Sequence, residues 1–130
     1  MLRDKAKEVL IERNFNCAET ILLLSNEAFQ LNLSEETFKA VGVFGSGLAS
    51  GEICGAVAAA CTVLGMLYTG EKFNLTPDCR RRVSTFISRV RETLGDTNCR
   101  VLRPKYFEPE IRCLKLVEQV ADLLEEITND

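Results

Sequence analysis

The chain has 130 residues, of which 46% are hydrophobic, and a formal net charge of −3. This length predicts a single domain over residues 1–130 with one thin core, and the mildly acidic balance argues against a general nucleic-acid binder. The sequence contains no histidine. That absence excludes Cys-His and Ser-His dyads, zinc sites that use histidine, and histidine ligation of haem.

Three amphipathic helices are predicted first, because apolar residues recur at helical spacing among charged ones. An asparagine, Asn14 or Asn16, suits the N-cap of the second helix, and Ser34 suits that of the third. A glycine-rich segment follows and predicts a tight turn or a close backbone approach. The helices are expected at residues 2–13, 17–31 and 35–44, and the turn at residues 42–51.

The next predicted helix, about residues 52–69, has no charged side chain from Ile53 to Tyr68 and is rich in glycine and alanine. A helix that is apolar on all sides must be buried, and small residues let its neighbours approach closely. The uncharged segment is only weakly hydrophobic, and its length is close to the minimum that a helix needs to span a bilayer. No membrane span is therefore expected. The charged N-terminal segment does not resemble a secretory signal, which predicts a cytoplasmic protein.

Two more helices are predicted in the last part of the chain. A Thr-Pro pair at 76–77 begins one of them, and Gly95 ends it. Residues 95–107 are expected to be irregular, and a final helix is predicted at residues 109–128. No segment reads as a strand. The expected fold is therefore all-α, a compact bundle of five or six helices around the buried central helix.

The cysteines carry most of the functional information. There are six, namely Cys17, Cys54, Cys61, Cys79, Cys99 and Cys113. No pair has C-x-x-C spacing, so the local signatures of zinc ribbons, thioredoxin-type sites and ferredoxin-type clusters are missing. Several lie in or near predicted first turns of helices, where free N–H groups and the helix dipole stabilise a thiolate: Cys17, Cys54, Cys79 and Cys113. We therefore expect the cysteines to act by meeting in three dimensions.

Three parts of the sequence together resemble a known family. They are Asn16-Cys17-Ala18-Glu19, Gly51-Glu52-Ile53-Cys54-Gly55-Ala56-Val57, and the downstream Cys99 and Cys113. This pattern, over about residues 3–125, resembles the C_GCAxxG_C_C family, for which a redox or iron–sulfur role is assumed. The chain departs from the motif at Ile53, where the motif has glycine. The resemblance implies an all-helical domain whose motif cysteines are Cys17, Cys54, Cys99 and Cys113.

Three functions fit these cysteines. In the first, two of the motif cysteines cycle between dithiol and disulfide in a thiol-dependent oxidoreductase, with Cys54 attacking and Cys99 or Cys113 resolving. In the second, Cys17, Cys54, Cys99 and Cys113 all bind one zinc ion or an iron–sulfur cluster that transfers electrons. In the third, the thiols are inert in a structural or interaction protein. Gly51 and Gly55 are expected to give a bound group access to the backbone.

Partners are predicted from composition and charge. A redox partner protein is expected under the first function. A central helix this apolar in so small a chain predicts a homodimer. The arginines of the helix at 77–94 are expected to form a solvated face that pairs with the acidic last helix. No nucleic acid and no membrane is expected as a partner.

Overall fold

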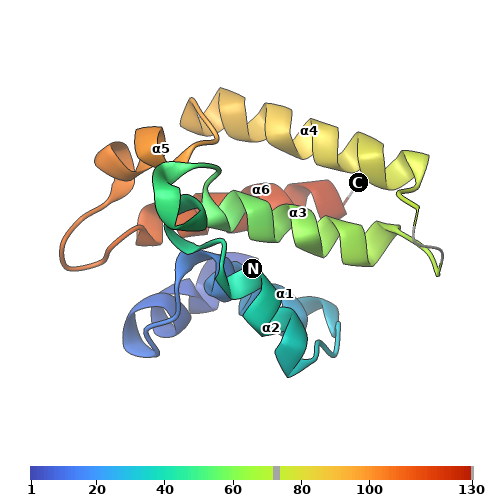
Figure 1. Ribbon diagram of the computed structural model, residues 1–130, viewed down its shortest axis with the longest axis horizontal. Helices are drawn as coiled ribbons and strands as arrows, with labels where there is room; N and C mark the ends of the chain where they lie inside the picture. The colour runs from blue at the N-terminus through green and yellow to red at the C-terminus, as the bar shows by residue number, and fades with distance from the viewer. Residues whose placement is uncertain (72–73, 130) are drawn as a thin grey trace.

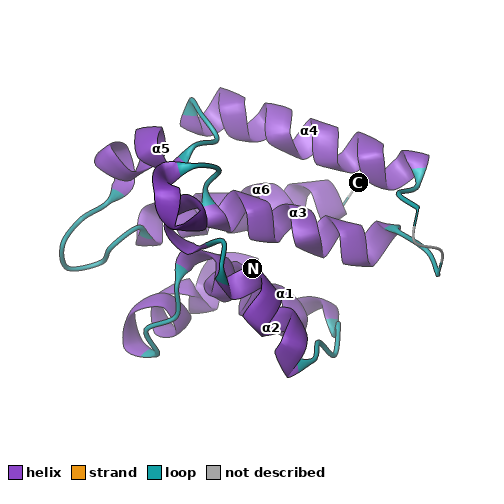
Figure 2. Cartoon of the chain, viewed as in Figure 1, coloured by secondary structure: helices purple, strands orange, loops and turns teal. Residues whose placement is uncertain are grey.

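The computed structural model describes residues 1–71 and 74–129. Within them the chain forms six α-helices and three short helical turns, and no strand (Figures 1 and 2). The α-helices are α1 Cys17–Phe29, α2 Glu35–Gly42, α3 Gly55–Tyr68, α4 Pro77–Leu94, α5 Cys99–Tyr106 and α6 Leu114–Thr128. The short turns are η1 Leu2–Lys5, η2 Glu8–Glu12 and η3 Gly47–Gly51. The prediction of an all-α fold is confirmed.

The buried central helix of the prediction is α3. It contacts α1, α4 and α6, and Figure 1 shows it running alongside α6, with α4 on one side and α1 and α2 on the other. Its buried residues are Gly55, Ala56, Val57, Ala59, Ala60, Val63 and Leu64. Because most of these side chains are small, the neighbouring helices approach α3 closely. No described helix is long and apolar enough to cross a bilayer.

The start of α3 lies three residues later than the predicted position near residue 52. Ile53 forms an antiparallel bridge with Asn98. The Cys54 N–H donates to the Thr97 carbonyl, and the Cys99 N–H donates to the Glu52 carbonyl, both at 2.7 Å. These long-range bonds hold the backbone extended before the helix, so Cys54 becomes the N-cap of α3 instead of a first-turn residue.

The prediction that residues 95–107 are irregular is wrong, because α5 lies within them. The Asp96 carboxylate accepts the N–H groups of Thr97 and Asn98 at 2.7 and 2.8 Å, which fixes the turn before the helix. Pro104 lies inside α5, although proline in a sequence usually signals a break. Cys99 therefore begins a helix and does not lie in a loop.

The last helix begins at Leu114 instead of residue 109. Residues 108–112 form a tight turn in which the Glu108 N–H donates to the Arg112 carbonyl at 2.9 Å. Arg112 adopts a φ of +56°, which no right-handed helix contains. Pro109 is thus part of this turn, and Cys113 is the N-cap of α6.

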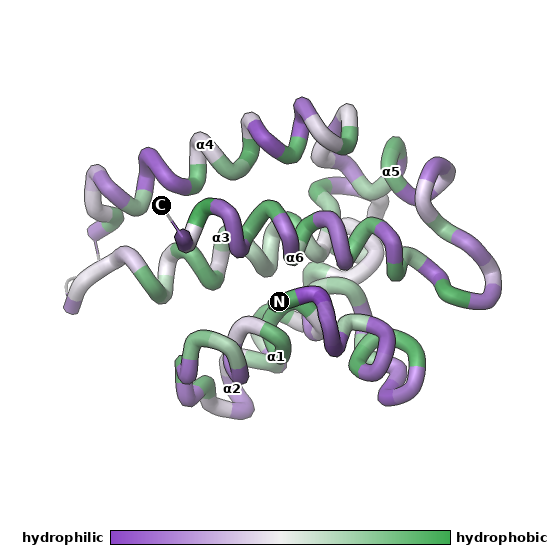
Figure 3. The backbone as a smooth tube through the Cα atoms, turned by 180° about the vertical axis from the view of Figure 1, so that it is seen from behind, coloured by the Kyte–Doolittle hydropathy of each residue, from purple (hydrophilic) through white to green (hydrophobic). Residues whose placement is uncertain are grey.

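The helix α4 has the bounds predicted from its capping residues. Hydrophilic and hydrophobic residues alternate along it in Figure 3, as expected for a helix with one face on the bundle. Arg89 forms an ion pair with Glu126 of α6 at 2.5 Å, and the Arg82 guanidinium donates to the Ile127 carbonyl at 2.8 Å. The predicted pairing of this basic helix with acidic residues of the last helix is confirmed at Arg89, whereas Arg81 and Arg82 pair with Asp78 of α4 itself.

Candidate functional site

The four motif cysteines surround one cavity of about 90 Å³, which we call the thiol cavity. It is lined by Cys17, Cys54, Cys99 and Cys113 together with Asn16, Ser46, Gly55, Arg103, Phe107, Arg112 and Leu116. Neither Cys61 nor Cys79 lines it, and both also lie outside the motif. The resemblance therefore selected the cysteines that the fold brings together.

Each cysteine of the thiol cavity lies at the start of a different helix. Cys17 is the first residue of α1, Cys54 the N-cap of α3, Cys99 the first residue of α5, and Cys113 the N-cap of α6. Figure 1 shows the starts of α3, α5 and α6 at the same end of the bundle. Free N–H groups and the positive ends of helix dipoles thus converge on the cavity.

A capping box fixes the start of α1. The Asn16 side chain accepts the Glu19 N–H at 2.8 Å, and the Glu19 carboxylate accepts the Asn16 N–H at 2.9 Å. The Asn16 amide also donates to the Gly42 carbonyl at 2.9 Å, which ties α1 to the end of α2. Of the two asparagines predicted as caps, Asn16 has this role, and Cys17 is thereby held at the cavity wall.

The glycine-rich segment forms an unusual left-handed turn beside the cavity. Four consecutive residues, 46–49, have φ angles between +55° and +62°. A Cβ on Gly47 would lie 2.8 Å from the Cys99 Cβ, and one on Gly55 would lie 2.7 Å from the Phe44 carbonyl oxygen. The close approach predicted at Gly55 is therefore made by the backbone of the protein itself, at the Phe44 carbonyl. Binding of a cofactor at Gly51 and Gly55 stays a prediction.

The Arg112 side chain connects the start of α6 to the segment before α1. Its guanidinium donates to the Leu10 carbonyl at 2.9 Å, to the Asn14 side chain at 3.0 Å and to the Phe15 carbonyl at 3.4 Å. These partners are 97 to 102 residues away in sequence. The contacts hold Cys113 beside Cys17, and no local pattern in the sequence pointed to Arg112.

Cys17 and Cys113 line the same cavity and lie close enough to shift each other's pKa. The Cys17 thiol is the main cause that lowers the pKa of the Cys113 thiol to about 7, with Arg103 and Arg112 acting in the same direction and burial acting against them. The Cys113 thiol, together with burial, raises the pKa of the Cys17 thiol well above its usual value. The pair therefore loses one proton near neutral pH and retains the other.

The other two cysteines of the cavity are protonated at neutral pH. Burial raises the pKa of the Cys54 thiol to about 11, although the N–H groups of Ala56 and Val57 act in the opposite direction. Burial and the neighbouring Cys113 raise the pKa of the Cys99 thiol. At Cys54 the effect of burial on the pKa is thus larger than that of the helix start, whereas the pKa of Cys113 is lowered; the role of Cys54 as the attacking thiol stays a prediction.

The family model for "Putative redox-active protein (C_GCAxxG_C_C)" matches residues 15–127. The chain belongs to the C_GCAxxG_C_C family. The matched range includes every residue that lines the thiol cavity. No curated protein and no solved structure matches the chain. The description of the C_GCAxxG_C_C family agrees with a redox role for the cysteines gathered here.

A metal centre was the second function predicted for these cysteines. In the part of this C_GCAxxG_C_C protein that the structure describes, no three histidine, cysteine, aspartate or glutamate side chains are arranged to hold one metal ion. A four-cysteine zinc site needs a tetrahedral set of sulfurs, and an iron–sulfur cluster also needs several thiolates around it. The described residues thus contain no preformed ligand set for either group, and the metal centre stays a prediction from sequence.

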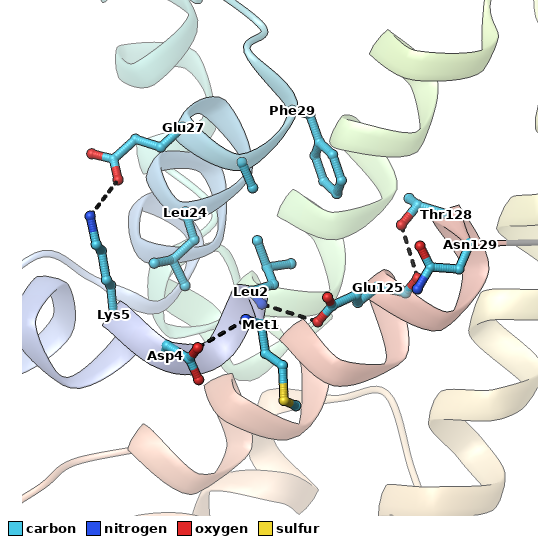
Figure 4. Close-up of a pocket in the computed structure, with 11 residues that line it drawn as sticks. Met1, Leu2, Asp4, Lys5, Leu24, Glu27, Phe29, Glu125, Thr128 and Asn129 are labelled. Atoms are coloured by element: carbon cyan, nitrogen blue, oxygen red, sulfur yellow. Dashed lines mark hydrogen bonds and ion pairs between the residues drawn. The ribbon is translucent and has the colours of Figure 1, made fainter.

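A second pocket, of about 460 Å³, lies where η1, α1 and α6 meet (Figure 4). Its polar groups are paired with one another: the Leu2 N–H donates to the Glu125 carboxylate at 3.0 Å, the N-terminal ammonium pairs with Asp4 at 2.9 Å, and Lys5 pairs with Glu27 at 3.8 Å. No cysteine lines this pocket. It contains no counterpart of the reactive thiol, so the thiol cavity is the candidate site.

Proposed function

We propose that this protein is a thiol–disulfide oxidoreductase in which Cys113 is the nucleophile and Cys17 the resolving thiol. The observation that carries the proposal is that these two thiols line the same cavity and lie close enough to shift each other's pKa. Two neighbouring cysteines close to a disulfide when the positions of their backbones suit its geometry. Arg112 supports the same pair by joining the segments that carry the two cysteines.

The reaction transfers two electrons from the protein dithiol to a substrate disulfide. The Cys113 thiolate attacks one substrate sulfur, so a Cys113–substrate disulfide forms, the substrate disulfide breaks, and the first half leaves as a thiolate. Cys17 gives its proton to that thiolate and then attacks the Cys113 sulfur. The second half leaves as a thiolate, which takes a proton from water. A reducing dithiol that is slender enough to enter the cavity reverses these steps and restores the protein.

Oxidation followed by peptide mapping tests the proposal. The reduced protein is treated with one equivalent of 2,2′-dithiodipyridine, a neutral disulfide, and remaining thiols are blocked with iodoacetamide. We expect one disulfide, between the peptides that contain Cys17 and Cys113, while Cys54 and Cys99 are alkylated. The Cys17→Ala variant should stop at a mixed disulfide on Cys113, and Cys113→Ala should form neither product.

The control variant for this experiment is Cys61→Ala, because Cys61 lies outside the cavity. It should form the Cys17–Cys113 disulfide as the unchanged protein does. A disulfide that joins Cys54 to Cys99, or no disulfide at all, would overturn the proposal. Iron or zinc bound to protein purified without oxygen, and lost in the Cys113→Ala variant, would favour the four-cysteine metal centre instead.

A further inference from the structure

A wider groove of about 640 Å³ adjoins the thiol cavity, and we call it the arginine groove. It is lined by Ser46, Ala49, Gly51, Cys99, Arg100, Arg103, Pro104 and Phe107. Four of these residues also line the thiol cavity, namely Ser46, Cys99, Arg103 and Phe107. The two spaces are therefore adjacent, so a molecule bound in the groove lies next to the thiol cavity.

Positive charge in the groove and the cavity is not balanced by acidic residues. No aspartate or glutamate lines either space. The Arg103 guanidinium stacks over the Phe107 ring at 4.7 Å from its centre, and Arg100 donates to the Ser50 carbonyl at 3.0 Å. No carboxylate of the described residues pairs with either of these arginines. Both guanidinium groups retain donors for an anion.

Two arginines elsewhere on the molecule, Arg3 and Arg81, differ from those in the groove because they are paired with carboxylates. Arg3 pairs with Glu118 at 3.2 Å and with Asp122 at 3.0 Å, and Arg81 pairs with Asp78 at 2.6 Å. Their charge is thus neutralised within the protein. In the groove, by contrast, the arginines and the helix starts that surround the cavity add positive potential at one place, which attracts anions.

The size of the thiol cavity limits what reaches Cys113. A volume of about 90 Å³ corresponds to only about three water molecules. A slender chain that carries a sulfur atom fits this space, whereas the surface of a folded protein does not enter it. The groove above is larger and contains Phe107, which is 38% exposed, and Pro104. It therefore offers apolar contacts as well as charge.

We propose that the arginine groove binds a small disulfide that carries carboxylates, with Arg100 and Arg103 holding the carboxylate while one sulfur of the disulfide enters the thiol cavity at Cys113. This proposal rests on the proposed function and specifies its substrate. Recognition is by charge in the groove, and electron transfer takes place in the cavity. The two steps therefore depend on different residues and are separable by mutation.

The test compares two probes by stopped-flow kinetics. The anionic probe is 5,5′-dithiobis(2-nitrobenzoate), which has a carboxylate on each half, and the neutral probe is 2,2′-dithiodipyridine. The measured quantity is the ratio of their second-order rate constants, relative to the same ratio for a short cysteine peptide. Any change in the acidity of Cys113 affects both probes and cancels in this ratio.

We expect the ratio to exceed that of the peptide in the unchanged protein and to fall roughly tenfold in the double variant Arg100→Gln, Arg103→Gln. Added salt should lower the ratio of the unchanged protein as well. The double variant Arg100→Lys, Arg103→Lys keeps the charges and should keep most of the preference. Arg80→Gln, an exposed arginine of α4 that lines neither space, is the matched control and should change nothing.

The outcomes separate the two proposals. If the glutamine double variant keeps its helical circular dichroism and the ratio does not fall, the groove does not select anions and the substrate proposal is overturned. The proposed function survives that result as long as the neutral probe still yields the Cys17–Cys113 disulfide. If the neutral probe yields no such disulfide, the proposed function fails whatever the ratio shows.

Discussion

The cysteines of the thiol cavity and the remaining two cysteines of the chain differ in their surroundings, although both groups contain a thiol at the start of a helix. Cys79 lies in the first turn of α4, is wholly buried, and donates its S–H to the Leu64 carbonyl at 3.5 Å. Burial and the neighbouring Cys79 raise the pKa of the Cys61 thiol to about 11. No arginine is among the groups that shift the pKa of Cys61.

Cys113 differs from Cys61 in the groups that lie near its sulfur. The neighbouring Cys17 thiol, Arg103 and Arg112 all lower the pKa of Cys113. Cys54, at the start of α3, has neither advantage and remains protonated like Cys61. At Cys54 burial outweighs the helix start, whereas at Cys113 the neighbouring thiol and two arginines offset the cost of burying the charge.

The largest expected effect comes from a substitution at the cavity end of α3. In Gly55→Ala the new methyl group would lie 2.7 Å from the Phe44 carbonyl oxygen, a backbone atom. We expect the free energy of unfolding to fall by about 2–3 kcal/mol. Gly65→Ala is the matched control in the same helix, because its Cβ would have no atom within 4 Å. That variant should gain about 0.5–1 kcal/mol.

Urea denaturation of both variants measures the difference. A similar change in stability for the two alanines would show that the close contact between α3 and the glycine-rich segment does not exist. Retained stability in Gly55→Ala, with a normal slope of the unfolding transition, would contradict the packing at the base of the thiol cavity.

The next effect concerns the acidity of Cys113. In the unchanged protein its alkylation by iodoacetamide should rise with pH and level off above about pH 7, because only the thiolate reacts. Cys17→Ala removes the main group that lowers the pKa of Cys113, so that pKa should rise and the alkylation rate at pH 7 should fall roughly thirtyfold. Cys61→Ala should leave the profile in place. An unchanged profile in Cys17→Ala would mean that the two thiols do not interact.

Much of the fold follows from local signals in the sequence. Thr76, Pro77 and Gly95 predicted both ends of α4, because capping and helix termination depend on neighbouring residues. The start of α3 and the existence of α5 were missed because they depend on backbone bonds between the segments around Ile53 and Asn98. Such pairing over a long stretch of chain leaves no periodic pattern in either segment.

The cysteines of the candidate site could be predicted from the sequence, but the contacts between them could not. The resemblance identified the four cysteines that line the cavity. Which two of them touch depends on the packing of α1 against α6, and that packing is held in part by Arg112. The sequence alone favoured Cys54 as the nucleophile because it shows where a helix begins and does not show how deeply the thiol is buried.

A smaller effect is expected from Arg112→Gln. The substitution removes a guanidinium that bonds to Leu10, Asn14 and Phe15, so stability should fall by about 1 kcal/mol. It also removes a cation near Cys113, and the pKa of that thiol should rise. Arg80→Gln controls for the loss of a surface charge. Urea denaturation and the alkylation profile together check the prediction, and an unaltered profile would remove Arg112 from the set of residues that activate Cys113.

The smallest effect should come from the cysteines outside the cavity. Cys79→Ala removes a buried sulfur and its weak hydrogen bond to Leu64, so the protein should lose at most about 1 kcal/mol of stability. The alkylation profile of Cys113 and the disulfide formed on oxidation should not change. Urea denaturation and peptide mapping of the oxidised variant measure these two quantities. Loss of the Cys17–Cys113 disulfide in this variant would mean that Cys79 takes part in the chemistry, and that a thiol needs neither a cavity nor a nearby arginine to do so.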